Sequence, residues 1–324
     1  MKFSIGYNEE NDFFELVKKY RNNISTIYFP MFHHITGSGR SITERTKTLK
    51  EYYDKVIKLI IICKSYGIET DLLLNSVCDG ENTGNKDFID KIIKLVKPLY
   101  SYGLTTVTLT DLSIVNRFKY EFPNIIICNS LNAFGVESVE ESLILKNIGV
   151  DILTIDSNIN YNVSLIRKIK EKSKLKIKIL INNSCMSMCP FDKQHANLAT
   201  HFCEPDGRIW EKGACGKIFR YNRRKFFRVP FIRPEDLKNY EFVDYLKIST
   251  RDRETHFIDK LLNIYISENY DGNILDILEV AFSDISNNKI KYIDNKKLGK
   301  LGFFEDMLKC PKDCDTCTNC DKFF

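Results

Sequence analysis

Short apolar stretches rich in β-forming residues alternate with longer amphipathic stretches along most of this chain. Eight such stretches are expected to be strands, namely Lys2 to Tyr7, Thr26 to Phe32, Thr70 to Ser76, Thr105 to Thr110, Asn124 to Asn129, Asp151 to Asp156, Lys176 to Ile181 and Tyr245 to Ser249. Strands that alternate with helices form parallel sheets. Eight units in roughly 270 residues favour a closed α/β barrel of the (β/α)8, TIM-like kind. A doubly wound open sheet is the alternative.

The stretches between the expected strands have apolar residues three and four positions apart, which is typical of helices with one buried face. These expected helices are Phe13 to Tyr20, Thr43 to Ser65, Phe88 to Tyr102, Ser138 to Ile148, Val163 to Lys172 and His256 to Asn269. Each could cover the outside of the barrel.

The regular pattern is interrupted once, by residues 184–244 between the seventh and eighth strands. A connection this long is usually functional, and it follows the carboxyl end of a strand, where active sites of this fold lie. We therefore predict a barrel over residues 1–270 that includes this insertion. Residues 271–324 are predicted to be an appendage with one helix-like stretch, Ile274 to Phe282, and a cysteine-rich end.

The chain has 324 residues with 48 Lys and Arg against 43 Asp and Glu, a surplus too small to indicate a nucleic-acid or membrane partner. It contains no apolar run long enough to span a membrane, and its first residues resemble a strand rather than a signal peptide. We therefore expect a soluble, cytoplasmic protein. Its 11 cysteines would then be reduced, so clustered ones are better explained by metal than by disulfides.

Four cysteines, Cys185, Cys189, Cys203 and Cys215, lie in the insertion. Four thiolates from one loop region suit a 4Fe-4S cluster and equally suit tetrahedral zinc. The alternative is that some are small buried side chains, as we expect for the isolated Cys63 and Cys128. Cys78, just past the third strand, fits either a core position or the barrel mouth.

Four further cysteines, Cys310, Cys314, Cys317 and Cys320, fall within eleven polar residues at the C-terminus. Packing does not explain them there, so we predict a metal site, either a second iron-sulfur cluster or zinc. The first three have the spacing of radical S-adenosylmethionine enzymes. In those enzymes the motif follows the first strand rather than the last, so we do not assign that chemistry.

Polar residues at the carboxyl ends of the strands are candidates for catalysis, because they meet at the barrel mouth. We select Asn75, Asp156 and Arg251, and add His195 and His201 from the insertion as metal ligands or proton carriers. A turn or helix cap is the alternative for any single Asn or Asp. Residues 208–228 mix basic and aromatic side chains, which suits RNA or an anionic metabolite, or else an ordinary solvated surface.

Three segments resemble the collagenase-like peptidases of family U-thirty-two (U32), in particular its short, barrel-only members. They are 182–201, with Cys185, Cys189, Pro190 and His195, then 231–237, and 245–251. The resemblance implies a barrel whose Cys185, Cys189, Cys203 and Cys215 hold an oxygen-sensitive 4Fe-4S cluster, with Arg251 in the pocket. It also implies that some members assist hydroxylation of tRNA, ribosomal RNA or the ubiquinone ring, while others are named as peptidases. The C-terminal cysteines are not part of the core family pattern.

We therefore expect an iron-sulfur-dependent modification enzyme of hydroxylase or oxidoreductase type, acting on RNA, a cofactor precursor or a peptide. The sequence contains no dinucleotide-binding fingerprint, so an external electron donor or partner enzyme is expected. A peptidase is the second possibility, although the chain has neither a Gly-x-Ser-x-Gly elbow nor a His-Glu-x-x-His helix. A non-catalytic, cluster-bearing partner protein is the third.

Overall fold

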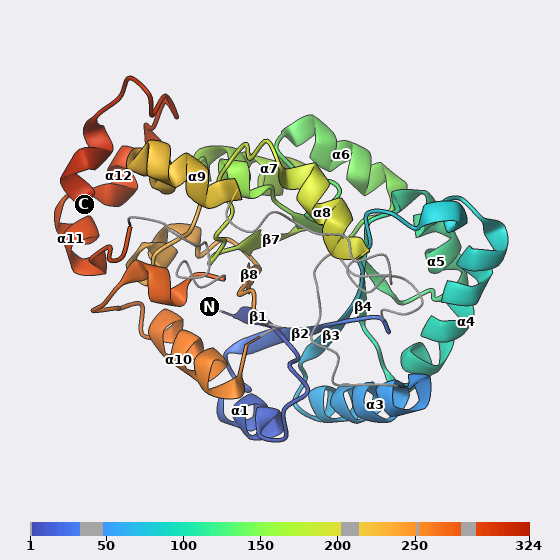
Figure 1. Cartoon of the computed structure of the whole chain (residues 1–324). Coiled ribbons are helices and arrows are strands. Elements are labelled where there is room, and N and C mark those ends of the chain that lie inside the picture. Colours follow the sequence, from blue (N-terminus) through green and yellow to red (C-terminus); the bar gives the residue numbers. More distant parts are fainter. Residues whose placement is uncertain (1, 33–47, 202–213, 251–252, 280–289) are drawn as a thin grey trace.

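The computed structural model describes residues 2–32, 48–201, 214–250, 253–279 and 290–324. Eight parallel strands close into a barrel in chain order, which confirms the predicted fold (Figure 1). The strands are β1 (Phe3–Gly6), β2 (Ile24–Pro30), β3 (Glu69–Leu74), β4 (Thr106–Leu109), β5 (Ile126–Asn129), β6 (Ile152–Thr154), β7 (Lys176–Leu180) and β8 (Tyr245–Lys247). Pairing of Phe3 with Leu246 and of Ser4 with Lys247 joins β1 to β8 and closes the barrel.

The connections that cover the barrel contain the expected helices and one that was not predicted. They are α1 (Phe13–Lys19), α3 (Leu49–Ser65), α4 (Lys86–Tyr102), α5 (Val115–Glu121), α6 (Val139–Ile148), α7 (Val163–Ser173) and α10 (Thr255–Ile266). Thr48 and Ser138 begin α3 and α6 with capping boxes. The unpredicted α5 buries only Val115 and Phe118 among its seven residues, too few to produce a clear helical period.

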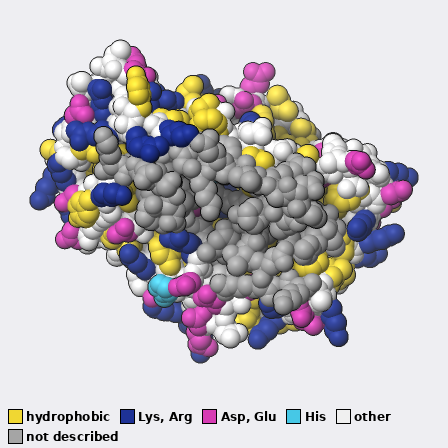
Figure 2. Space-filling view, in the orientation of Figure 1, with side chains coloured by type: hydrophobic (Ala, Val, Ile, Leu, Met, Phe, Trp, Pro, Cys, Tyr) yellow, Lys and Arg dark blue, Asp and Glu magenta, His cyan; other side chains and the backbone are white. Residues whose placement is uncertain are grey.

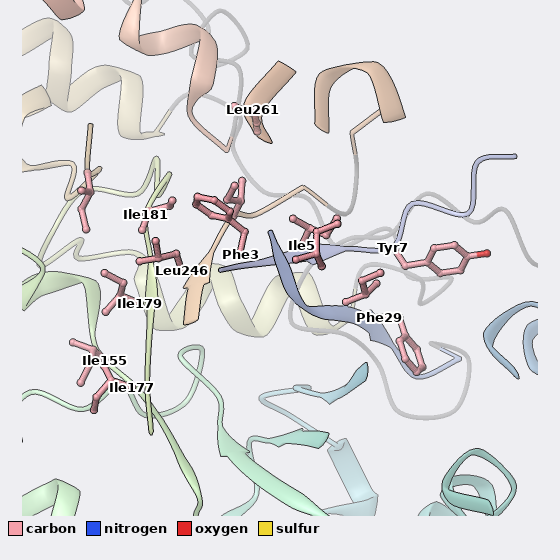
Figure 3. Packing of buried hydrophobic residues seen from close by; sticks show 14 of the residues in the cluster. Phe3, Ile5, Tyr7, Phe29, Ile155, Ile177, Ile179, Ile181, Leu246 and Leu261 are labelled. Carbon is pink, nitrogen blue, oxygen red and sulfur yellow. The ribbon is translucent and has the colours of Figure 1, made fainter. Parts of the chain in front are cut away.

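The large apolar core lies between the barrel wall and the surrounding helices (Figure 3). Phe3, Ile5 and Leu246 belong to this core, as does Leu261 of α10. Successive residues of a strand point to opposite faces of the sheet. The strand residues that alternate with those of the apolar core therefore point into the barrel. Those inward positions are mostly polar and include Ser4, Thr26, Asp71, Thr108 and Lys178, all of which are buried. The barrel interior is therefore a polar layer enclosed by an apolar shell.

The insertion and the C-terminal region add short helices on one side of the barrel. The insertion contains α8 (Asp192–Thr200), α9 (Ala214–Tyr221) and the 3-10 turns η4 (Arg223–Arg228) and η5 (Pro234–Tyr240). The C-terminal region contains η6 (Ile274–Ile277), α11 (Asn295–Lys300), α12 (Phe303–Leu308) and η7 (Asn319–Phe323). The helix expected over 274–282 is a single 3-10 turn in its described part, and residues 280–289 lie outside the described residues.

Aromatic side chains join the C-terminal region to the insertion. Phe303 stacks on Phe231 with ring centroids 5.4 Å apart, and Phe227 lies 5.6 Å from Phe303 and 5.3 Å from Phe323. Arg233 binds Asp236 and also donates to the Asn295 carbonyl at 2.9 Å. Residues 290–324 therefore pack on the insertion. Within the described ranges, no helix is both long and apolar enough to cross a membrane.

Candidate functional site at the barrel mouth

A cavity of about 340 Å³ opens at the carboxyl ends of the strands. Its wall combines residues that follow β5, β6 and β7 with residues along the length of α8. Polar and sulfur-bearing side chains on this wall are Asn132, Asp156, Asn158, Asn183, Cys185, Cys189, Asp192, His195 and Glu279. The insertion thus supplies one side of the cavity and the barrel supplies the other.

Of the four insertion cysteines, Cys185 and Cys189 line this cavity. Their loop is fixed by two hydrogen bonds to Arg228 of η4: Ser187 N–H donates to the Arg228 carbonyl at 2.8 Å, and the guanidinium donates back to the Ser187 carbonyl at 3.0 Å. Cys203 lies outside the described residues, and Cys215 lies in α9 with no described side chain. A shared centre for all four therefore stays a prediction.

Asp156 is both a cap and a cavity residue. Its carboxylate accepts the Asn158 N–H at 2.8 Å, at the start of the 3-10 turn η3 (Ser157–Ile159). Burial raises the pKa of Asp156, the Asn158 hydrogen bond opposes this, and the nearby carboxylates of Glu137 and Asp192 raise it further. The catalytic role predicted for Asp156 stays a prediction, but a carboxyl group with a raised pKa does line the cavity.

The two predicted histidines belong to α8 but lie in different surroundings. His195 lines the cavity, whereas His201, at the end of α8, is buried next to Cys78 in the loop after β3. A hydrogen bond from Val77 N–H to Thr200 Oγ1 at 3.1 Å ties the two segments together. Figure 1 shows α8 crossing the mouth above β4.

The Cys78 thiol is surrounded by groups that stabilise a thiolate. A hydrogen bond from the Gly80 backbone N–H lowers the pKa of Cys78 most, followed by one with His201; burial opposes them, and the charge of His201 and a contact with Asn197 add to the lowering. The thiol is partly accessible, unlike the fully buried Cys63. The sequence had left Cys78 undecided between core and mouth, and the structure brings it together with His201.

A smaller hollow continues downward into the barrel and shares Leu131, Asn132 and Leu180 with the first cavity. The predicted Asn75 lines it, together with Lys178 and Lys247. Lys178 binds Asp71 at 2.9 Å. Burial lowers the pKa of Lys178, but the charges of Asp71 and Cys128 and the hydrogen bonds with both residues together outweigh burial and raise it. Neither lysine was predicted, and Arg251 lies outside the described residues.

The C-terminal cysteines lie beside the insertion and apart from the cavity wall. Cys314 and Cys320 are buried, and Cys310 and Cys317 are half-buried. Across the described ranges, no three His, Cys, Asp or Glu side chains are arranged to hold a metal ion. The predicted ligand role of these cysteines stays a prediction.

The described part of the basic and aromatic stretch is mostly a paired surface. Phe219, Phe226 and Phe227 are buried, while Lys225 binds Asp315 at 3.0 Å and Arg223 binds Asp321 at 3.6 Å. Figure 2 shows Lys and Arg side chains gathered at the edge formed by α9 and the C-terminal region.

No family model matches the sequence. An uncharacterized protease of Methanocaldococcus jannaschii is 28% identical over 320 residues, covering 97% of this chain and 91% of that protein. The solved structure of a U32 peptidase has a TM-score of 0.54 at 17% identity, covering 76% of this chain and 92% of that one. The first likeness covers nearly the whole of both chains, and the second, at 17% identity, shows a shared fold. These two proteins carry protease or peptidase names, and neither name mentions an iron-sulfur cluster or a hydroxylase.

Proposed function

We propose that this chain is a thiol-dependent peptidase whose nucleophile is Cys78 and whose general base is His201. The observation that carries the proposal is the position of Cys78 beside His201 at the barrel mouth, where the loop after β3 meets the end of α8. The protease and peptidase names of the two relatives support the same class of activity. This class replaces the hydroxylase as our first choice.

The surroundings of the thiol match what covalent catalysis needs. A cysteine nucleophile requires a base within hydrogen-bonding reach and a third group that orients the base. His201 forms a hydrogen bond with the thiol. Burial raises the pKa of Asp79, the residue after Cys78, and the charge of His201 acts against this rise. The Gly80 backbone N–H already donates to the sulfur and so favours its negative form.

In the proposed reaction, His201 takes the proton from Cys78 and the sulfur attacks the peptide carbonyl. The protonated imidazole then gives that proton to the leaving amine, so a thioester forms as the peptide bond breaks. Water, deprotonated by the imidazole, hydrolyses the thioester and restores the thiol and the neutral histidine. The reaction consumes one water and needs no redox partner.

The test is hydrolysis of a mixed library of fluorescence-quenched peptides by the purified chain and by Cys78→Ser and His201→Gln variants. Each variant is expected to lose at least about 100-fold in kcat/KM. Cys63→Ala is the matched control, because Cys63 is isolated and buried in α3, and it should keep its rate. Full activity in Cys78→Ser would rule out this nucleophile, and an inactive wild-type chain would argue against a peptidase.

A second candidate is the iron-sulfur-dependent modification enzyme, favoured by the placement of Cys185 and Cys189 together on the cavity wall. Two accessible thiols on one loop fit half of a four-cysteine site. Cys203 and Cys215 would complete it, and the cluster would supply electron transfer or substrate binding. Substrates would be RNA, a cofactor precursor or a peptide, with an electron donor or partner enzyme.

Anaerobic purification followed by iron and sulfide analysis tests this second candidate. A Cys185→Ala variant should lose about four irons per chain while its circular dichroism stays unchanged. Cluster loss without any change in peptide hydrolysis would separate the two candidates. A chain that binds a cluster but turns over nothing by itself would indicate a non-catalytic partner protein.

A further inference from the structure

We infer that the small hollow inside the barrel is a subsite for a carboxylate, and that the substrate is a short peptide whose carboxylate enters this hollow. That the ligand is a peptide rests on the proposed function, whereas the carboxylate subsite rests on the hollow itself. The inference is carried by the charge of the wall, the fixed position of its lysines, the closed floor and the contrasting charge of the outer cavity.

The described wall of the hollow is cationic. Lys178 and Lys247 line it, and no Asp or Glu is among the described residues of this wall. Side chains that can donate hydrogen bonds, Asn75, Ser130 and Asn132, line the same hollow. A few such polar groups in a concave site are what orient a small ligand. A wall of this composition favours an anion.

The lysine nearer the mouth is held by a fixed aromatic ring. The Lys247 ammonium lies 4.4 Å from the centre of the Tyr28 ring. The Tyr28 hydroxyl donates to the Ile248 carbonyl at 2.8 Å and accepts the Thr250 N–H at 3.1 Å, so the ring cannot turn away. A cation that is positioned before binding loses less conformational entropy when an anion arrives.

The hollow ends at a closed floor inside the barrel. Its volume is about 50 Å³, against about 340 Å³ for the outer cavity. Lys178 and Asp71 form an ion pair there, with side chains 3% and 1% exposed, and Thr108 donates to Asp71 at 2.8 Å. A peptide chain cannot continue past this floor. The hollow therefore accepts the end of a molecule, and a carboxylate is an anionic end group of suitable size.

The outer cavity has the opposite charge. Asp156, Asp192 and Glu279 line it, and its described wall contains no Lys or Arg. The two spaces share Leu131 and Leu180, so one ligand can occupy both. A peptide with a single carboxylate would place its charge among the lysines and its neutral or basic part beside the acids. A nucleic acid would bring repeated phosphates against those acids, which disfavours RNA.

The hollow also adjoins the loop of the proposed nucleophile. Asn75 lines the hollow and is three residues before Cys78 in the loop after β3. The Ser76 hydroxyl donates to the Cys78 carbonyl at 2.9 Å, which holds the loop in shape. A carboxylate bound in the hollow would thus anchor the peptide beside this loop.

The test is calorimetric titration of the full-length Cys78→Ser chain, so that binding is measured without the proposed nucleophile. The probes are acetyl-trialanine with a free carboxylate, the same peptide as its C-terminal amide, and that amide with glutamate as its last residue. We expect the free acid to bind about 10-fold more tightly than the plain amide, or better, because hydrogen bonds to charged groups are the strong ones. Tighter binding of the glutamate amide would instead place a side-chain carboxylate in the hollow, which supports the same subsite.

A pair of variants in the Cys78→Ser chain locates the effect. Lys247→Met should remove most of the preference for the acid and leave the affinity for the plain amide nearly unchanged, which also shows that the variant is folded. Lys91→Met is the matched control, because it removes one positive charge from an exposed position of α4. It should keep the full preference.

Three outcomes would overturn the inference. One is equal binding of all three peptides, and another is a preference for the acid that survives in Lys247→Met. The third is displacement of the acid peptide by inorganic phosphate more readily than by acetate, since that would indicate a phosphate site. An inactive wild-type chain in the hydrolysis assay would refute the peptidase without touching the preference for acid over amide. An active chain that binds acid and amide equally would refute only the subsite.

Discussion

Removing the carboxylate of Asp71 should destabilise the barrel from its centre. Asp71 and Lys178 form an ion pair of 2.9 Å with side chains 1% and 3% exposed. Asp71 also accepts two contacts from Thr108, at 2.8 and 3.0 Å. In Asp71→Ala the ammonium of Lys178 stays buried without its counter-charge. Breaking a buried pair in this way costs about 3–5 kcal/mol of unfolding free energy.

The cost should depend on pH with a definite sign. In the wild type, the pKa of Lys178 is raised above 10.5, so the pair stabilises the fold below that pH and loses its effect as pH rises through the raised value. In Asp71→Ala, burial, which is the largest cause, lowers the pKa of Lys178, and only the smaller effects of Cys128 oppose it. The variant's deficit should therefore shrink from neutral pH toward about pH 10, because its lysine can become neutral at little cost.

Urea unfolding at several pH values measures both effects, with the slope m used to check that the unfolded state is unchanged. Asp71→Leu/Lys178→Met is the matched control, since replacing a buried pair by apolar residues is often nearly neutral. A loss below about 1 kcal/mol in Asp71→Ala is what a solvent-exposed pair would give. That result, or a deficit independent of pH, would refute the reasoning that Lys178 is left charged and buried without a counter-charge.

Three smaller predictions concern the mouth and its supports. Asp156→Asn should raise the urea midpoint at pH 7, because burial raises the pKa of this carboxyl and so disfavours its charged form in the folded protein. The gain should vanish below about pH 3.8, where the carboxyl of the wild type is protonated in both the folded and the unfolded chain. Iodoacetamide at pH 7.5 should modify Cys78 and spare Cys63, whose pKa burial raises to about 12, as mass spectrometry would show. Asn160→Ala should cost about 1–3 kcal/mol in urea unfolding, since the buried amide donates to the carbonyls of Leu180 and Pro230.

The sequence predicted the barrel because its strands and helices have distinct periods. Each expected strand overlaps an observed one, and the long helices α3 and α4 carry clear apolar faces. The same periodicity could have revealed the polar interior. Thr106, Thr108 and Lys178 alternate with apolar residues, so they had to point away from the helix layer.

The candidate site was only partly predictable because its parts come from distant segments. Position after a strand was enough to select Asn75 and Asp156, which both line hollows at the mouth. The meeting of Cys78 with His201 had no local signal, since the hydrogen bond that joins their segments spans 123 positions. The loop after β3 and the end of α8 become neighbours only when the insertion folds back over the mouth.

The mouth should also depend on the C-terminal region through a continuous set of contacts. Phe303 packs on Phe227 of η4, and Arg228 of the same turn makes the two hydrogen bonds that hold Ser187 between Cys185 and Cys189. Phe303→Ala should therefore cost about 3–5 kcal/mol and also loosen the cysteine loop. Alkylation of half-buried Cys189 should become faster under conditions where the barrel remains folded, and Leu308→Ala, at an exposed position of the same helix, should leave it unchanged. An unaltered Cys189 rate in a destabilised Phe303→Ala chain would show that the barrel alone shapes the mouth.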